Sequence, residues 1–209
     1  MYRHFFKRFI DIVVSVIALP FVLLVIAVFA PMIYLTDKGP VFYNATRRGK
    51  NGKTFTMYKL RSMYVNAPVI KAADGSTYTG DNDPRVTKIG RLMRKLSVDE
   101  FPQFLNVLKG DMSLIGPRPS LATTPYEQLD DIRRRRLAVR PGVTGYAQAY
   151  YRNSITQDEK FRLDVEYAEN VSFVFDVKIL FHTVYSVLAR KNINAKEPVV
   201  AKEEAKIGE

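Results

Sequence analysis

The segment IVVSVIALPFVLLVIAVFAPMIYL, residues 12–35, decides the architecture of this chain of 209 residues. No charged side chain lies between Asp11 and Asp37. As one helix, the segment would extend about 36 Å, which is enough to cross a hydrocarbon core of about 30 Å. A signal peptide has a shorter apolar run and a cleavage site of small residues, and no such site follows Pro31. The segment therefore predicts a membrane helix that the mature protein keeps.

Pro20 and the charged flanks determine how this helix meets the membrane. Proline lacks an N–H group and displaces the carbonyl of the preceding turn, so a kink is expected. Basic residues mark the cytoplasmic side of a membrane helix, and this segment has them on both sides. They are Arg3, Lys7 and Arg8 before the segment, and Lys38, Arg47, Arg48, Lys50 and Lys53 after it. Two interpretations remain open: a kinked single span, and a helix broken near Pro20 that re-enters on the cytoplasmic face.

The composition indicates a polyanionic partner. Lysine and arginine number 32 against 21 aspartate and glutamate, which gives a formal charge of +11. Such an excess fits nucleic acid, an anionic membrane surface or phosphorylated substrates, and composition alone does not choose among them. The sequence has no cysteine, which excludes disulfides, thiolate metal sites and a cysteine nucleophile.

The remaining sequence predicts a mainly α fold with a small β-hairpin. Asn51-Gly52 is a strong turn signal between two β-rich runs, 41–43 and 53–58. Apolar periodicity and the Gly and Pro breaks predict the other elements. These are an irregular loop over 63–83 and helices over 86–96, 99–110, 125–139, 161–167 and 176–189. We expect three parts: a membrane-embedded helix over 1–36, a membrane-associated catalytic domain on the cytoplasmic face over 37–190, and a disordered polar tail over 191–209.

Asp99-Glu100 is the dipeptide best suited to chemistry. Its ordinary interpretation is helix capping, with Asp99 as N-cap or with residues 97–100 as a capping box. In a first helical turn, however, two carboxylates also feel the positive end of the helix dipole, which keeps them ionised. An ionised aspartate can attack phosphorus to form an acyl phosphate, and carboxylates can hold Mg²⁺ together with substrate phosphates. The residues around the pair decide between capping and catalysis.

Four arginines beside breaks in the sequence suit phosphate binding. Arg94 precedes the acidic pair, Arg118 lies between two prolines, Arg140 precedes Pro141-Gly142, and Arg152 follows two tyrosines. Planar guanidinium groups suit bidentate binding of diphosphate oxygens. A solvated surface charge is the alternative for any one of them. The four consecutive arginines over 133–136 cannot face one site and fit anionic lipid head groups or solvent.

Five stretches of the sequence resemble the bacterial sugar transferase family, the monotopic phosphoglycosyl transferases that initiate glycoconjugate and exopolysaccharide assembly. They are NDPRVTKIGR (82–91), DEFPQ (99–103), NVLKGDMS (106–113), GPRP (116–119) and RPGVTG (140–145). Lys7, Arg8 and Asp11 ahead of an apolar segment that contains Pro20 also match. The similarity extends from about residue 2 to residue 190, and the length fits the small form of the family.

The resemblance implies a re-entrant helix at the cytoplasmic face of the bacterial inner membrane and a two-step transfer with Mg²⁺. The residue matching Asp99 attacks the β-phosphorus of a UDP-sugar and releases UMP. Polyprenyl phosphate, expected to be undecaprenyl phosphate, then takes the sugar phosphate. Asp99 is also the expected magnesium ligand, and Glu100 matches the carboxylate that assists the acceptor or the metal. Arg94, Arg118 and Arg152 match positions associated with phosphate or nucleotide binding.

The sequence departs from the family pattern at four places. Leu19-Pro20 replaces the usual Ser-Pro, which removes a hydroxyl able to hydrogen-bond the freed carbonyl. Ala45 replaces a glutamine that precedes the hairpin arginine, Tyr146 replaces a tryptophan, and Tyr150-Tyr151 replaces Asn-Gly. The last changes fall near the expected nucleotide and sugar site, so the resemblance does not identify the sugar.

Three other hypotheses remain open. A non-catalytic, membrane-anchored scaffold would use its arginines for anionic lipid and would not depend on Asp99. A nucleic-acid binder is suggested only by charge and lacks any recognised module, so we expect no nucleic-acid partner. Within the enzyme class, the acceptor phosphate can attack the UDP-sugar directly, without a covalent intermediate. The sequence also leaves a homodimer open.

Overall fold

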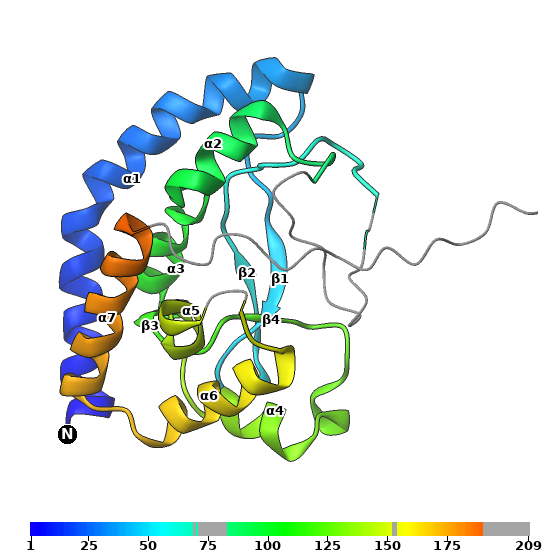
Figure 1. Cartoon of the computed structure of the whole chain (residues 1–209). Helices are drawn as coiled ribbons and strands as arrows, with labels where there is room; N and C mark the ends of the chain where they lie inside the picture. The colour runs from blue at the N-terminus through cyan, green and yellow to red at the C-terminus, as the bar shows by residue number, and fades with distance from the viewer. Residues whose placement is uncertain (69, 71–82, 152–153, 190–209) are drawn as a thin grey trace, which may run out of the picture.

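Figure 1 shows the computed structural model of the chain, which describes residues 1–68, 70, 83–151 and 154–189. One long helix, α1, forms one side of the molecule, and shorter helices and two small sheets lie beside it. The expected class, mainly α with a small β-hairpin, is confirmed. Arg152, the tail over 191–209 and most of the loop expected over 63–83 lie outside the described residues.

The apolar segment forms α1 (Lys7–Asp37), which follows a π-helical turn at Tyr2–Phe6. α1 is one continuous helix that contains Pro20 and Pro31, and it bends rather than breaks (Figure 1). The bend agrees with the expected kink, and α1 does not have the break near Pro20 that one of the two open interpretations contained. Each proline removes one hydrogen bond of the ladder, and the remaining bonds let the helix continue around a bend. The re-entrant path itself stays a prediction.

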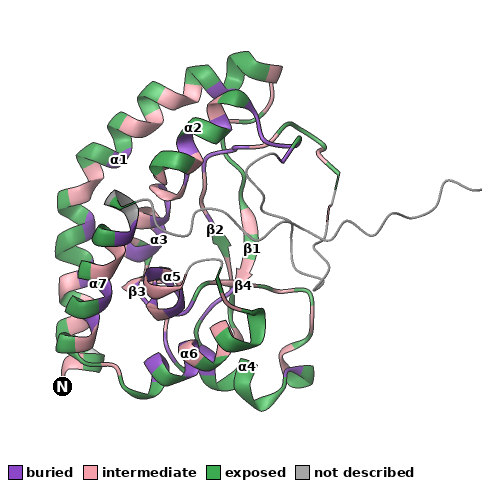
Figure 2. Cartoon of the chain, viewed as in Figure 1, coloured by how far each residue is buried: buried purple, intermediate pink, exposed green. Residues whose placement is uncertain are grey.

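α1 has one buried stripe and a wide exposed apolar face (Figure 2). Val22 and Ile33 are buried, and Ile33 packs with Leu60 and Met93 of the globular part. On the opposite side the side chains are open, and Leu35 is 75% exposed. Within the described part of the chain, α1 is the one helix long and apolar enough to cross a membrane. An exposed apolar face of this size marks a surface that contacts lipid or another protein.

The hairpin consists of β1 (Ala45–Arg48) and β2 (Thr54–Met57), which pair antiparallel, and β4 (Ser120–Leu121) pairs with the other edge of β1. At the turn, Asn51 takes a left-handed backbone (φ 54°), as its Asn-Gly signal predicts. The strand expected over 41–43 is wrong, since only an isolated bridge from Phe42 remains there. The turn sets the register, so the residues nearest to it form the ladder.

Three short helical elements carry the acidic pair. They are α2 (Lys88–Leu96), a 3₁₀ turn (Val98–Glu100) and α3 (Gln103–Lys109). Ser97, which joins α2 to the 3₁₀ turn, has a left-handed backbone (φ 57°). Neither Ser97 nor Pro102, the residues before the last two elements, makes a side-chain cap hydrogen bond. The capping interpretation of the acidic pair is therefore wrong, and its carboxylates are left for other partners.

The remaining elements complete the domain. They are β3 (Ser113–Ile115), α4 (Asp131–Arg135), β5 (Gly142–Thr144), α5 (Tyr146–Tyr150), α6 (Gln157–Glu169) and α7 (Phe173–Leu188). β3 and β5 pair in parallel, and a core that includes Ile115, Tyr167 and Ile179 packs around them. A single helix over 125–139 is wrong, because Asp130 has an extended backbone and caps α4 instead. The helices expected over 161–167 and 176–189 correspond to α6 and α7.

The N-terminal end of α1 is fixed to the globular part by buried polar contacts. Lys7 forms an ion pair with Asp176 of α7 (Nζ to Oδ2, 2.7 Å), and Arg8 donates to two carbonyls at the end of α3. Asp11 is buried and accepts a hydrogen bond from Ser113 Oγ (3.1 Å). These contacts satisfy the three charged residues that precede the apolar segment.

The C-terminal end of α1 is fixed to the same globular part. Lys38 has a left-handed backbone (φ 52°), which ends the helix. Both carboxylate oxygens of Asp37 accept from the guanidinium of Arg61, each at 2.6 Å. This fork geometry is the strongest arrangement available to an arginine and a carboxylate. One globular part therefore holds both ends of the long apolar helix.

Candidate active site

The acidic pair lies beside Lys59 in the folded chain. Lys59 follows β2, and the N–H of its neighbour Leu60 donates to the carbonyl of Asp99 (2.9 Å), which joins the two segments. The Nζ of Lys59 lies 2.8 Å from Asp99 Oδ2 and 3.3 Å from Glu100 Oε1. One ammonium group therefore serves both carboxylates.

Asp99 is buried, with 4% of its side chain exposed. Its Oδ2 has one partner, the ammonium group of Lys59 (2.8 Å), and no second donor among the residues that the structure describes. A carboxylate oxygen can accept two hydrogen bonds. An oxygen with a single partner keeps a lone pair for attack on an electrophile.

Glu100 connects the pair to Arg118. Its Oε1 accepts from Arg118 Nη2 at 3.2 Å and from Lys59 at 3.3 Å. Burial alone would raise the pKa of Glu100, but the charges of Lys59 and Arg118 outweigh burial and lower this pKa to about 2. The Arg118 side chain is 59% exposed, so the site opens to solvent at this edge. A phosphate group can therefore reach its guanidinium.

The backbone around Arg118 is held from two sides. Arg136 donates from Nη2 to the carbonyl of Arg118 (2.7 Å). Gly116 packs directly on the backbone of Arg140, where any Cβ would clash with the Arg140 carbonyl. The motifs GPRP and RPGVTG thus pack against each other, and the glycine permits their close approach. This packing limits where the Arg118 side chain can reach.

Two further arginines lie near the acidic pair. Arg94, which the sequence predicts as a site residue, is half-buried beside the pair. It donates from Nε to Ser62 Oγ (2.9 Å). Burial lowers the pKa of Arg94, and the charge of Asp99 is the largest effect that opposes burial. In β1, burial and the charge of Arg118 lower the pKa of Arg47, whose Nε has no acceptor among the described residues. Three arginines and one lysine thus accompany two carboxylates, and this positive excess fits a diphosphate.

The other predicted residues lie apart from the acidic pair. Arg140 donates from Nε to the carbonyl of Gly110, at the opposite end of α3 (2.8 Å). This contact supports the packing of α3, and a phosphate-binding role for Arg140 stays a prediction. Lys7, Arg8 and Asp11 fix α1 as described above, and Arg152 lies outside the described residues.

The arginine run over 133–136 is not uniform. Arg133 and Arg135 are about half exposed, as expected for a surface that meets solvent or lipid. Arg136 is buried and pairs with Asp164 of α6 (Nη2 to Oδ2, 2.6 Å), so the expectation is wrong for this residue. An arginine can be buried where a carboxylate and a carbonyl take its donors.

Asp99 and Glu100 suit a magnesium ion that is shared with a substrate. Mg²⁺ commonly takes one or two protein carboxylates, while phosphate oxygens and water complete its shell. Within the described ranges there is no group of three or more His, Asp and Glu side chains that would hold a metal without substrate. Asp99 and Glu100 match the one or two carboxylates that such an ion takes, and magnesium binding stays a prediction.

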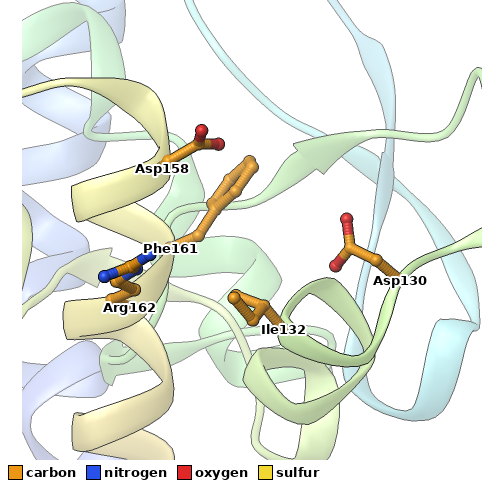
Figure 3. A pocket seen from close by; sticks show the side chains of 5 residues that line it. All are labelled: Asp130, Ile132, Asp158, Phe161 and Arg162. Atoms are coloured by element: carbon orange, nitrogen blue, oxygen red, sulfur yellow. The ribbon is translucent and has the colours of Figure 1, made fainter.

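The cavity in Figure 3 is a second place where polar side chains converge. It lies between α4 and α6, has a volume of about 220 Å³ and does not include the acidic pair. Its lining residues are Asp130, Ile132, Asp158, Phe161 and Arg162. The acidic pair instead combines a buried carboxylate with positive groups that can bind phosphate. We therefore take this group as the candidate active site: Lys59, Asp99, Glu100 and Arg118.

The sequence pattern missed Lys59 and Arg47. Lys59 is 40 residues away from Asp99 along the chain and lies in no turn or helix start that would single it out. Arg47 had one signal, because it occupies the place of the hairpin arginine in the family pattern. Only the fold brings the hairpin next to the acidic pair.

Comparison with known proteins shows the family of this chain. The model of a family described as bacterial sugar transferases matches residues 2–190. The chain belongs to the bacterial sugar transferase family. Among its relatives in this family, an uncharacterized sugar transferase of Bacillus subtilis, EpsL, is 42% identical over 196 residues, which is 93% of each chain.

Other members of the bacterial sugar transferase family are longer. The galactosyl transferase CpsE of Streptococcus agalactiae is 42% identical over 196 residues, which cover 90% of this chain and 43% of CpsE. The UDP-glucose:undecaprenyl-phosphate glucose-1-phosphate transferase of Escherichia coli is 38% identical over 194 residues, which cover 88% of this chain and 40% of the relative. The chain thus spans less than half the length of these two relatives.

Proposed function

We propose that this chain transfers a sugar-1-phosphate from a UDP-sugar to a polyprenyl phosphate, giving UMP and a polyprenyl diphosphosugar. The name of the Escherichia coli relative supports this class of donor and acceptor. The observation that carries the proposal is the buried Asp99, whose Oδ2 lies 2.8 Å from Lys59 and has no other donor within the described part of the chain. The positive groups around it suit a diphosphate.

In the first step, an oxygen of Asp99 attacks the β-phosphorus of the UDP-sugar. The bond from this phosphorus to the bridging oxygen breaks, and the bridging oxygen leaves on UMP with its electron pair. Lys59, Arg94 and Arg118 stabilise the negative charge that the diphosphate carries and develops. The product is a sugar phosphate joined to Asp99 as an acyl phosphate.

In the second step, an oxygen of the polyprenyl phosphate attacks the same phosphorus. The bond between phosphorus and Asp99 breaks, and the carboxylate of Asp99 is regenerated. With a pKa of about 2, Glu100 is a weak base, so it suits metal binding and the positioning of Arg118 better than proton removal. Asp99 and Glu100 would hold Mg²⁺, which neutralises phosphate charge when bound.

The proposal includes a cytoplasmic location for both ends of α1. The contacts of Lys7 and Asp37 join both ends to one globular part, which leaves no end for the opposite side of the membrane. Val98, directly before Asp99, packs in the cluster that contains Ile33 of α1. The nucleophile therefore follows a residue in contact with the apolar helix, where a lipid-linked acceptor would arrive.

The release of UMP tests the proposed reaction. Detergent-solubilised wild type should release UMP from at least one member of a panel of UDP-sugars when polyprenyl phosphate and Mg²⁺ are present. Asp99→Asn should lose this activity, whereas Asp131→Asn on the surface of α4 should keep it. Equal release by wild type and Asp99→Asn would favour a non-catalytic scaffold.

Cysteine labelling tests the path of α1. The chain has no cysteine of its own, so single cysteines can be placed at Tyr2 and at Lys53. In intact inverted membrane vesicles, both should react with an impermeant maleimide from the same side. Labelling from opposite sides would show a single span and refute the re-entrant path.

A further inference from the structure

α7 exposes an apolar face that the proposed reaction does not use. Phe181 is 72% and Val174 61% exposed, and the other exposed apolar side chains lie on the same side of the helix. With 3.6 residues per turn, the exposed apolar residues fall within an arc of about 140°. They are Phe173, Val174, Val177, Leu180, Phe181, Val184 and Tyr185. We call this surface the α7 stripe.

The inward face of α7 packs Ile179 and Phe175 in the core and also carries polar contacts. Asp176 is buried and binds Lys7 and the hydroxyl of Tyr167. Thr183 and Thr144 share a hydrogen bond between their hydroxyls (2.8 Å), and Ser186 is buried and donates to the carbonyl of Ala149 (2.7 Å). A helix at a water-facing surface turns polar and charged side chains outward, whereas the outward face of α7 is the apolar stripe. The arrangement in α7 therefore indicates an apolar surrounding.

The α7 stripe continues the exposed apolar surface of α1. Phe173, at the start of α7, packs edge-to-face on Tyr2 (ring centroids 5.8 Å apart), and the ion pair of Lys7 with Asp176 lies one turn further. Both helices rise from the same end of the molecule in Figure 1. Next to this junction, Phe9 of α1 is also exposed.

We propose that the α7 stripe is immersed in the hydrocarbon of the same bilayer that receives α1. The proposal rests on the membrane placement of α1 given above, because continuity with α1 is what selects lipid as the partner. α7 has 16 residues, too few for the usual span of about 20, so it lies within one leaflet or its interface. Lys178, the exposed charged residue at the edge of the stripe, can extend its ammonium group to the lipid head groups.

Quenching of a fluorophore by lipid tests this surface in the full-length chain. Single cysteines replace Phe181 in the α7 stripe, Ile17 on the exposed face of α1, and Asp131 on α4. Each variant is labelled with an environment-sensitive NBD group and placed in phosphatidylethanolamine and phosphatidylglycerol vesicles. A fraction of the phospholipids carries a nitroxide on the acyl chain, which quenches only fluorophores in contact with hydrocarbon.

The label at Phe181 should lose as much fluorescence as the label at Ile17, while the label at Asp131 should lose none. Quenching at Ile17 without quenching at Phe181 would overturn the proposal for α7 and leave the placement of α1 intact. In that case, cross-linking between two Phe181→Cys copies would identify a second copy of the chain as the cover. Absence of quenching at both positions would refute the membrane placement of α1, and the proposal for α7 with it.

Discussion

Two regions of the molecule bury an aspartate next to a lysine, and they differ in how the aspartate is satisfied. In the anchor region, where α1 meets α7, both oxygens of Asp176 accept hydrogen bonds, and their donors are Tyr2, Lys7 and Tyr167. In the candidate active site, Lys59 is the one donor to Asp99 Oδ2 among the described residues.

The difference separates a structural carboxylate from a reactive one. A buried carboxylate that accepts from three donors stabilises the fold and keeps few lone pairs free. A buried carboxylate with a single partner contributes less to stability and stays available as a nucleophile. We therefore expect a substitution of Asp99 to reduce activity more than stability. The matched substitution of Asp176 should reduce stability more than activity.

The largest effects should come from replacing the two aspartates. Asp99→Asn should lower the rate of UMP release at least about 1,000-fold, since it removes the nucleophile, with little change in the melting temperature. Asp176→Asn should lower the free energy of unfolding by about 3–5 kcal/mol, because it leaves Lys7 buried without its partner. Both quantities are measured in one detergent, by UMP release and by thermal unfolding. A large loss of stability in Asp99→Asn would contradict the distinction.

Replacing the two lysines should give smaller effects of the same kind. Lys59→Gln should lower kcat for UMP release about 100-fold, because one positive group that stabilises the transferred phosphate is lost. Lys7→Gln should leave the kcat of the folded fraction unchanged and should cost about 1–3 kcal/mol of stability. If Lys7→Gln reduced kcat as much as Lys59→Gln, the anchor region would take part in catalysis and the comparison would fail.

Arg118→Gln should show the smallest effect, which is visible in the pH dependence. Loss of this guanidinium should raise the KM for the UDP-sugar about tenfold. It should also raise the pKa of Glu100 from about 2, so that Glu100 becomes protonated at a higher pH. The acid limb of kcat/KM should therefore move to higher pH. Arg135→Gln, which breaks an exposed pair with Glu169, is the control and should change neither property. An unchanged KM and pH profile in Arg118→Gln would remove Arg118 from the site.

Local signals in the sequence were sufficient for several elements. The apolar segment predicted α1, Asn51-Gly52 predicted the hairpin turn, and the periodicity over 86–96 predicted α2. The acidic pair and two of the four arginines, Arg94 and Arg118, also come together as expected. In each case the physical cause of the feature lies in a few neighbouring residues. The sequence pattern alone is therefore enough to predict it.

The rest depends on contacts that are distant in the sequence. β3 and β5 are three residues long, and they pair in parallel only because the glycines of two motifs pack together. Lys59 gains its role from the hydrogen bond between Leu60 and Asp99, and Arg136 from its partner Asp164 on another helix. The exposed apolar face of α7 was hidden because its apolar content also fits a core helix.

The mass of a trapped intermediate tests the central assignment most directly. Wild-type protein is mixed with its UDP-sugar and Mg²⁺ without polyprenyl phosphate, and intact protein is then analysed by mass spectrometry. The account predicts that the chain gains the mass of one sugar phosphate, that fragmentation places it on Asp99, and that Asp99→Asn gains nothing. If wild type released UMP only when polyprenyl phosphate was present and never carried the added mass, transfer would be direct, and the assignment of Asp99 as nucleophile would be wrong.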